Sequence, residues 1–184
     1  MELPIFELKI DGDGTGVTAV ALVNQPAIGI EYQMFNKAMR FNIADAEQRV
    51  VMGAAMIPNL PIYRMDNERG EYFAVFSKET IRKIAEKFFK DNRQGSFNEE
   101  HNPDKLVKGG FTFQSFITDE KMGILPPKGF ENIAEGTWFI AAKIENDEVW
   151  DKIKKDGEYK GFSIEGMFDV IPYVTMSKII KKYI

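Results

Sequence analysis

Residues 50–90, VVMGAAMIPNLPIYRMDNERGEYFAVFSKETIRKIAEKFFK, contain the clearest structural pattern in the chain. The apolar run at the start predicts a buried strand over 48–57, which two prolines bring to an end. Two shorter runs, 62–65 and 71–76, flank a polar turn closed by Gly70, and this arrangement predicts a hairpin. Strands that follow one another through hairpins favour a mainly antiparallel sheet over a doubly wound parallel one.

The same stretch ends in the helix that the sequence predicts most clearly, 78–90. Ser77 precedes this helix and suits its N-cap, because a serine side chain accepts a hydrogen bond from a free N–H of the first turn. Apolar residues recur at spacings of three and four, which places them on one helix face. These residues are Ile81, Ile84, Ala85, Phe88 and Phe89.

The remainder of the chain adds more strands than helices. The patterns predict strands over 1–10, 17–23, 111–118, 136–145 and 160–173, and a short helix over 147–155 capped by Asn146. The polar segment 91–108 is expected to be mostly loop, with 96–100 as an alternative short strand. Residues 30–48 lack periodicity and predict an extended arm. We therefore expect a mainly β or α+β fold, built as an antiparallel sheet or small barrel with appended helices.

Composition restricts the classes of function. The chain has 184 residues, enough for one domain with a substantial core, and its net charge of −4 offers no basic excess for nucleic acid. It has no cysteine, which excludes disulfides, thiolate metal sites and a cysteine nucleophile. The start is acidic, unlike a signal peptide, and no apolar run approaches the length of a membrane span. We therefore expect a soluble protein with neither nucleic acid nor membrane as partner.

The only histidine of the chain, His101, lies in the polar segment FNEEHNPDK. A lone histidine in such a segment is by default a solvated loop residue. Zinc binding is not expected, because one histidine without cysteine offers too few ligands and no HExxH-type pair is present. No metal or other cofactor is expected.

Ser163 lies in GFSIEG, residues 161–166, within an otherwise apolar strand. The flanking Gly161 and Gly166 would let a substrate backbone approach, because they carry no side chain. The stretch is not a nucleophile elbow, since that motif is G-x-S-x-G followed by a helix. A bulge or turn within the strand is the structural alternative.

A serine hydroxyl needs a neighbouring base to take its proton, and histidine, whose ordinary pKa is near neutrality, is the side chain best suited to this role. The imidazole would in turn need an acceptor that orients it. Glu165 lies two residues from Ser163, on the same face of a regular strand, and Asp119 ends the strand that follows His101. A dyad of Ser163 with Lys160 is disfavoured, because three residues along a strand place two side chains on opposite faces. The other carboxylate candidates are Glu100, Asp104 and Glu145.

Several segments, taken in order, resemble the XkdF-like phage serine proteases, relatives of the prohead maturation proteases that share a fold with herpesvirus assemblins. VTAVALVNQPAIGIEYQMF is similar to the opening segment of that family, and VVMGAAMIPNLPIYR with YFAVFSKETIRKIAEKFFK is similar to its strand–hairpin–helix block. NEEHN resembles the histidine motif, GGFTFQSFITDEKMG the following strand, and GTWFIAAKIENDEVWDKIKKDGEYKGFSIEGMF the strand–helix–serine block. Several motifs in one order are far more specific than either candidate catalytic residue alone.

The resemblance implies an antiparallel, herpesvirus-protease-like β-barrel with one long and one or two short surrounding helices. It implies a serine endopeptidase that digests scaffold and trims capsid protein inside the phage prohead, in the cytoplasm of the bacterial host. Scaffold and major capsid proteins would be its partners as substrates, and a homodimer is a further expectation. His101 corresponds to the base of the family and Ser163 to its nucleophile.

The third catalytic member is open at this point. The herpesvirus enzymes use a second histidine, which this chain lacks, so the resemblance implies an acidic residue, with Asp119 preferred over Glu165. Where relatives often have Glu-Ser on the strand after the histidine, this chain has Gln114-Ser115. The expected division of the chain is an N-terminal strand and extended segment (1–45), a protease domain (46–175) and a helical tail (176–184). The alternatives to an enzyme are a phage head or scaffold-associated structural protein that kept the fold and lost turnover, and a generic binding module.

Overall fold

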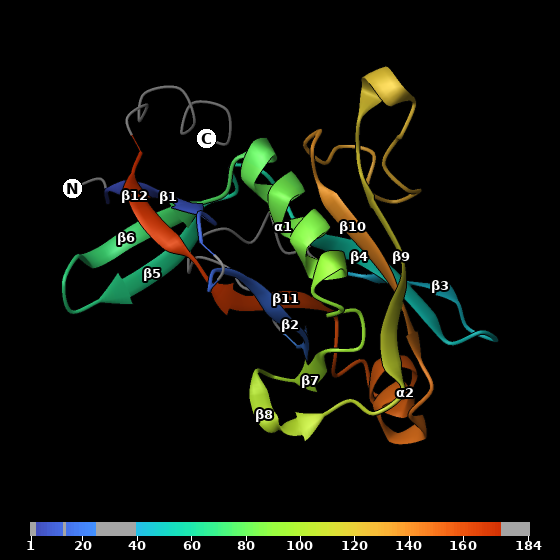
Figure 1. The fold of residues 1–184 in the computed structure, drawn as a ribbon. Coiled ribbons are helices and arrows are strands. Elements are labelled where there is room, and N and C mark those ends of the chain that lie inside the picture. The colour runs from blue at the N-terminus through green and yellow to red at the C-terminus, as the bar shows by residue number, and fades with distance from the viewer. Residues whose placement is uncertain (1–2, 13, 25–39, 174–184) are drawn as a thin grey trace.

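The computed structural model describes residues 3–12, 14–24 and 40–173, which form a β-rich α+β fold (Figure 1). Their strands make three four-stranded sheets. In spatial order the sheets are β12 (Asp169–Pro172), β1 (Ile5–Lys9), β6 (Gly70–Val75) and β5 (Ile62–Asp66); β3 (Asn42–Asp45), β4 (Val50–Met56), β10 (Trp138–Ile144) and β9 (Gly110–Ile117); and β11 (Gly161–Met167), β2 (Gly16–Val23), β7 (Phe97–Glu99) and β8 (Asn102–Leu106). The β1–β6 and β2–β7 pairs are parallel, and the other pairs are antiparallel. The predicted tail, 176–184, and most of the predicted extended arm lie outside the described residues.

The expected barrel is not confirmed, because none of the three sheets closes on itself. β4 of one sheet and β11 of another approach each other. Within the described ranges no backbone pairing joins these two strands. Ala55 and Met56 of β4 and Ile164 of β11 instead line one cavity. Side chains therefore lie between the two strands, in place of a ladder of backbone hydrogen bonds.

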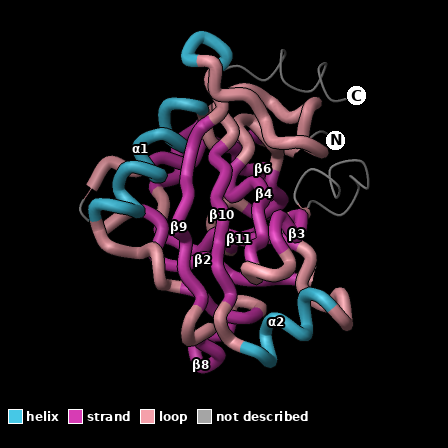
Figure 2. The backbone as a smooth tube through the Cα atoms, turned by 90° about the vertical axis from the view of Figure 1, so that its right-hand side faces the viewer, coloured by secondary structure: helices cyan, strands magenta, loops and turns pink. Residues whose placement is uncertain are grey.

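The two predicted α-helices are present. α1 (Lys78–Lys90) begins as expected, with the Ser77 side chain accepting a hydrogen bond from the Thr80 N–H, and α2 (Asp147–Lys154) is capped by Asn146. The apolar face of α1 packs on β2 and β10, where the ring of Phe88 lies 5.4 Å from that of Trp138. Figure 2 shows α1 beside the β9–β10–β4 layer and α2 at one end of it. A short 3-10 helix, η1 (Glu120–Met122), follows β9. In the part of the chain that the structure describes, no helix has the length and apolar character needed to cross a membrane.

The N-terminal strands are built into the sheets of the rest of the chain. β1 lies between β12 and β6, and β2 lies between β11 and β7. Val20 and Leu22 of β2 are fully buried in the main core, together with Phe162 of β11. β2 therefore supplies the strand to which the two chain segments carrying the candidate catalytic residues are attached.

Two segments differ from their predicted structure. The single strand predicted over 160–173 is two strands, β11 and β12, which belong to different sheets. Phe168 stands between them and packs edge-on against Phe76, with ring centroids 4.9 Å apart. In the segment 91–108, expected to be mostly loop, β7 confirms the alternative short strand over 96–100, and β8 pairs with it to form a hairpin. β8 was not predicted, because it has mostly exposed polar residues and lacks the apolar alternation that indicates a strand.

An ion pair joins α2 to the β7–β8 hairpin. The Glu99 carboxylate lies 2.5 Å from Lys152 Nζ and accepts a hydrogen bond from the Tyr159 hydroxyl, also at 2.5 Å. Partial burial alone would raise the pKa of Glu99, but the contacts with Lys152 and Tyr159 outweigh it and hold this pKa below its usual value. The ionised carboxylate therefore stabilises the fold and anchors the hairpin.

We predict that Glu99→Gln lowers the free energy of unfolding at pH 7. A pKa below 4.5 in the folded state means that the stabilisation is present above pH 4.5 and is lost as the pH falls through the folded-state value. The difference between wild type and variant, measured by urea unfolding at several pH values, should therefore shrink on acidification. Glu86→Gln, an exposed position on α1, is the control. A difference that did not change with pH would contradict this role of the ionised carboxylate.

Gly53 of β4 allows the chain before β3 to cross close above it. A Cβ at this position would lie 2.8 Å from both Cα and Cβ of Phe41. The Phe41 ring in turn packs 5.2 Å from that of Phe162, the neighbour of Ser163 in β11. The close crossing thus supports the strand that carries the candidate nucleophile.

We expect Gly53→Ala to reduce the free energy of unfolding by about 1–3 kcal/mol, the usual cost of overpacking a core. Chemical denaturation followed by tryptophan fluorescence measures this change. Gly95→Ala is the matched control, because a Cβ there meets no atom within 4 Å. Equal stability of the two variants would show that the Phe41 crossing relaxes freely.

Candidate active site

His101 lies in the turn of the β7–β8 hairpin. Glu99 pairs with Asn102, so Glu100 and His101 form a two-residue connection, and both have positive φ, 51° and 58°. Tight hairpins favour this conformation, but it suits Asn-Gly far better than Glu-His. The Glu100 N–H donates to the Leu22 carbonyl at 3.0 Å, and the Glu100 carboxylate accepts from the Asn24 N–H at 2.6 Å. These bonds to the end of β2 hold the strained turn, and with it the imidazole, in place.

The strand register makes the Ser163 side chain project to the same face of the sheet as Asn98 of β7. In the β11–β2–β7 order, Ser163 is opposite Ala21, and Ala21 is opposite Asn98. Directly opposed residues project to the same face of a sheet. The small side chain of Ala21 leaves room above β2 for groups that reach across from either neighbour. The serine itself is 5% exposed.

Ser163, His101 and Glu165 form a continuous hydrogen-bonded chain. His101 Nε2 lies 3.0 Å from Ser163 Oγ, and His101 Nδ1 lies 3.1 Å from Glu165 Oε1. Glu165 reaches the far ring nitrogen because it is two residues from Ser163 on the same strand face. When Nδ1 carries the ring proton and donates a hydrogen bond to the carboxylate, Nε2 has a free lone pair and can accept the serine proton.

Asn98 of β7 is a fourth member of this arrangement, and it was not singled out from the sequence. Its amide Nδ2 donates to Glu165 Oε1 at 2.5 Å, from a side chain in a residue only 3% exposed. Its Oδ1 is also buried and has no hydrogen-bond partner among the described residues. The sequence indicates Asn98 only if 96–100 is taken as an interior strand, because a polar residue then occupies a buried position.

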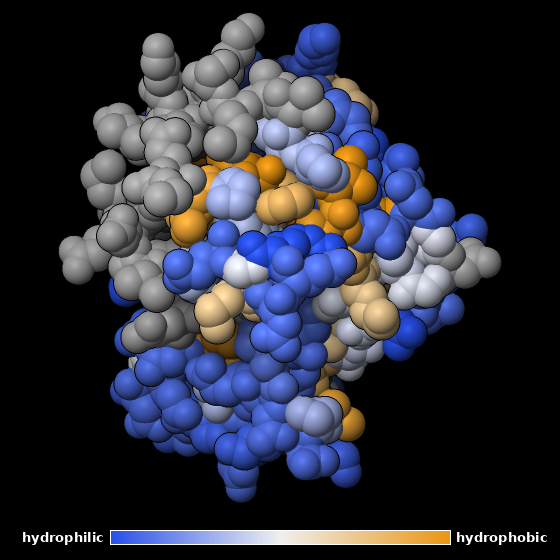
Figure 3. All heavy atoms as spheres, turned by 90° about the vertical axis from the view of Figure 1, so that its left-hand side faces the viewer, coloured by the Kyte–Doolittle hydropathy of each residue, from blue (hydrophilic) through white to orange (hydrophobic). Residues whose placement is uncertain are grey.

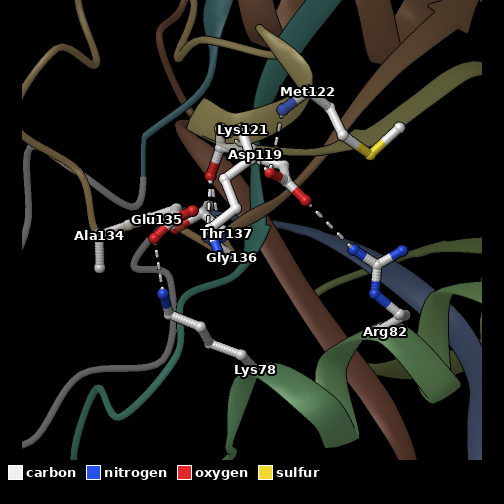
Figure 4. A network of polar contacts seen from close by, with 10 residues as sticks. Lys78, Arg82, Asp119, Lys121, Met122, Ala134, Glu135, Gly136 and Thr137 are labelled. Atoms are coloured by element: carbon white, nitrogen blue, oxygen red, sulfur yellow. Dashed lines mark hydrogen bonds and ion pairs between the residues drawn. The ribbon is translucent and has the colours of Figure 1, made fainter.

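Asp119 belongs to a different network, near the start of η1 (Figure 4). Its carboxylate accepts hydrogen bonds from the backbone N–H groups of Lys121 and Met122, at 3.1 and 3.2 Å, and lies 3.8 Å from Arg82 Nη2. Within the described residues it makes no hydrogen bond or ion pair with His101. The geometry therefore brings Glu165, the less favoured of the two sequence candidates, to the imidazole and assigns Asp119 to capping a turn.

The other side chains considered from the sequence make no hydrogen bond or ion pair with His101 within the described ranges. The Lys160 ammonium donates to Asn24 Oδ1 at 3.0 Å, and the Ser115 hydroxyl accepts from the Trp138 indole at 2.8 Å. Among the residues that the structure describes, the carboxylates of Glu100, Asp104 and Glu145 make no hydrogen bond or ion pair with the His101 ring.

The structure explains Gly166 by the packing of β2, whereas from the sequence we expected it to make room for a substrate backbone. A Cβ there would lie 2.3 Å from the Gly16 carbonyl oxygen, so glycine is required by the close approach of β2 rather than by an incoming substrate. The register of β11 against β2 shifts between Glu165 and Gly166. This bulge re-aims the strand directly after the carboxylate.

The arrangement suits nucleophilic acyl transfer. The hydroxyl has a base within hydrogen-bond reach, and the base has a carboxylate behind it, which is the geometry shared by serine hydrolases of unrelated folds. Within the described ranges, no group of three His, Asp or Glu side chains could hold a metal ion.

Comparison with known proteins agrees with this chemistry. A model of the family described as "Putative phage serine protease XkdF" matches residues 38–172, which include His101, Ser163 and Glu165. No curated protein matches the chain significantly, and neither does any solved structure. Since the match covers well over half of the 184 residues, the chain belongs to this XkdF family.

Proposed function

We propose that the chain is a serine endopeptidase in which Ser163 is the nucleophile, His101 the general base and Glu165 the residue that orients the base. The observation that carries the proposal is the pair of contacts on one imidazole, Nε2 to Ser163 at 3.0 Å and Nδ1 to Glu165 at 3.1 Å. Each ring nitrogen meets the group that its role requires. The Asn98 amide donates to the same carboxylate oxygen, Oε1, and helps to hold it in place.

In the proposed reaction, Ser163 Oγ attacks the scissile carbonyl while His101 Nε2 takes its proton. The resulting imidazolium is stabilised by Glu165 and returns the proton to the leaving amine. Water then enters, is activated by the same base, and releases the acyl group from Ser163. The buried position of Ser163 favours these charge movements, because electrostatic interactions are stronger away from bulk water.

The outer edge of β11 is a suitable track for a peptide. β2 occupies one edge of this strand, and on the other, among the described residues, only the bridge from Arg40 to Gly161 is present. An extended substrate can therefore add along Ile164–Met167, the accessible part of β11, through main-chain hydrogen bonds, which position the scissile bond beside the serine. We further propose, from the family to which the chain belongs, that the substrates are scaffold and major capsid proteins of the phage prohead.

Substitution of the three residues tests the assignment. Ser163→Ala and His101→Ala should abolish cleavage of co-expressed scaffold and labelling by a fluorophosphonate. Glu165→Gln should lower kcat on the order of 10⁴-fold with little change in KM, because loss of the acceptor permits the wrong tautomer. Asp119→Asn should retain activity. If Asp119→Asn were inactive and Glu165→Gln active, the third member would be misassigned, and full activity of Ser163→Ala would rule out the protease proposed here.

The pH dependence of kcat/KM gives a separate check on His101. Protonation of Nε2 removes the lone pair that accepts the serine proton, so the rate should be lower at acidic pH than at neutral pH. Steady-state rates between pH 5 and 8, on a peptide taken from a mapped cleavage site, measure this fall. A flat profile over this range would argue against histidine as the base.

A further inference from the structure

A cavity of about 50 Å³ lies beside Ser163, between β11, β4 and β5. Eight of its ten lining residues are apolar, among them Ala55, Ile62 and Ile164. Arg64 is its one charged neighbour, and the guanidinium Nη1 donates to the carbonyl of Tyr63 at 3.1 Å. Figure 3 shows apolar atoms gathered among hydrophilic ones on the face of the molecule that bears β1, β5, β6 and β12.

The cavity lies where it could receive the side chain of the substrate residue that carries the scissile carbonyl. In an acyl-enzyme the substrate carbonyl carbon is bonded to Ser163 Oγ. The Cβ of the same substrate residue is two bonds from that carbonyl carbon. Ser163 and Ile164 both line the cavity, so it follows the same strand along which we place the peptide. The side chain next to the scissile carbonyl is therefore the substrate group best placed to enter it.

We infer that this cavity is the specificity pocket for the residue on the acyl side of the scissile bond, and that it selects small aliphatic side chains such as alanine or valine. The inference rests on the proposed function of Ser163. An apolar cavity of about 150 Å³ holds a benzene ring, so one a third of that size excludes aromatic side chains. A charged side chain would lose its hydration against the apolar lining.

Ile62 offers a way to alter the pocket without touching the catalytic groups. It is a half-buried residue on β5 that lines the cavity, so Ile62→Ala enlarges the space without changing a residue of the candidate site. Met65 lies on the same strand, is 71% exposed and does not line the cavity. Met65→Ala is therefore the matched control.

The experiment digests a mixture of peptides from a bacterial proteome with the wild-type chain and with Ser163→Ala, and mass spectrometry identifies the Ser163-dependent cleavage sites. Synthetic peptides then carry alanine, valine, phenylalanine or glutamate before the scissile bond. We expect kcat/KM to favour alanine and valine by about tenfold or more over the other two. Ile62→Ala should raise the relative rate for phenylalanine, and Met65→Ala should leave the ranking unchanged.

Each other outcome overturns one of the two proposals. Ser163-dependent cleavage without an aliphatic preference, or with glutamate preferred through Arg64, contradicts the pocket and leaves the protease intact. An unchanged ranking in Ile62→Ala also contradicts the pocket. Absence of Ser163-dependent cleavage at any peptide, together with no fluorophosphonate labelling, contradicts the protease itself.

Discussion

The register of β2 between β11 and β7 is the constraint on which the candidate site depends. It sets Ser163, Ala21 and Asn98 in one row across three strands, with the serine and the amide on the same face. A slip of one residue in either pairing would turn one of these side chains to the opposite face. The buried Val20 and Leu22 resist such a slip, because it would move them out of the core. Core packing and site geometry are therefore specified by the same strand.

The site combines two different degrees of rigidity. Ser163 and Glu165 are held at a fixed spacing by one strand, whereas the imidazole between them arrives on a two-residue turn with 44% of its side chain exposed. Three bonds compensate for the strained turn: two from Glu100 to the end of β2, and the ion pair of Glu99 with Lys152 of α2. The geometry of the candidate site thus relies on contacts made by the two residues that precede the histidine.

Much of the fold could be predicted from local pattern, and the failures have physical reasons. α1, α2 and their caps were predictable because helix periodicity and capping act within a few residues. β7 matches the alternative short strand over 96–100, whereas β8 was not predictable, since it is an exposed edge with little apolar alternation. The division of 160–173 into two strands, and the absence of a closed barrel, depend on contacts between distant segments such as Phe168 with Phe76. No short window of sequence contains such information.

The candidate site shows the same division between local and distant information. Because side chains alternate along a strand, the sequence predicts that Glu165 and Ser163 lie on one face. This alternation could not rank Glu165 above Asp119, because the ranking depends on where the fold places His101. Asn98 was invisible for a related reason: its value lies in being buried, and burial there depends on β2 and β11. An apolar residue would avoid the cost of its unpartnered Oδ1. That a polar one stands there is best explained by its bond to Glu165, which sets the carboxylate, and through it the imidazole, before any substrate arrives.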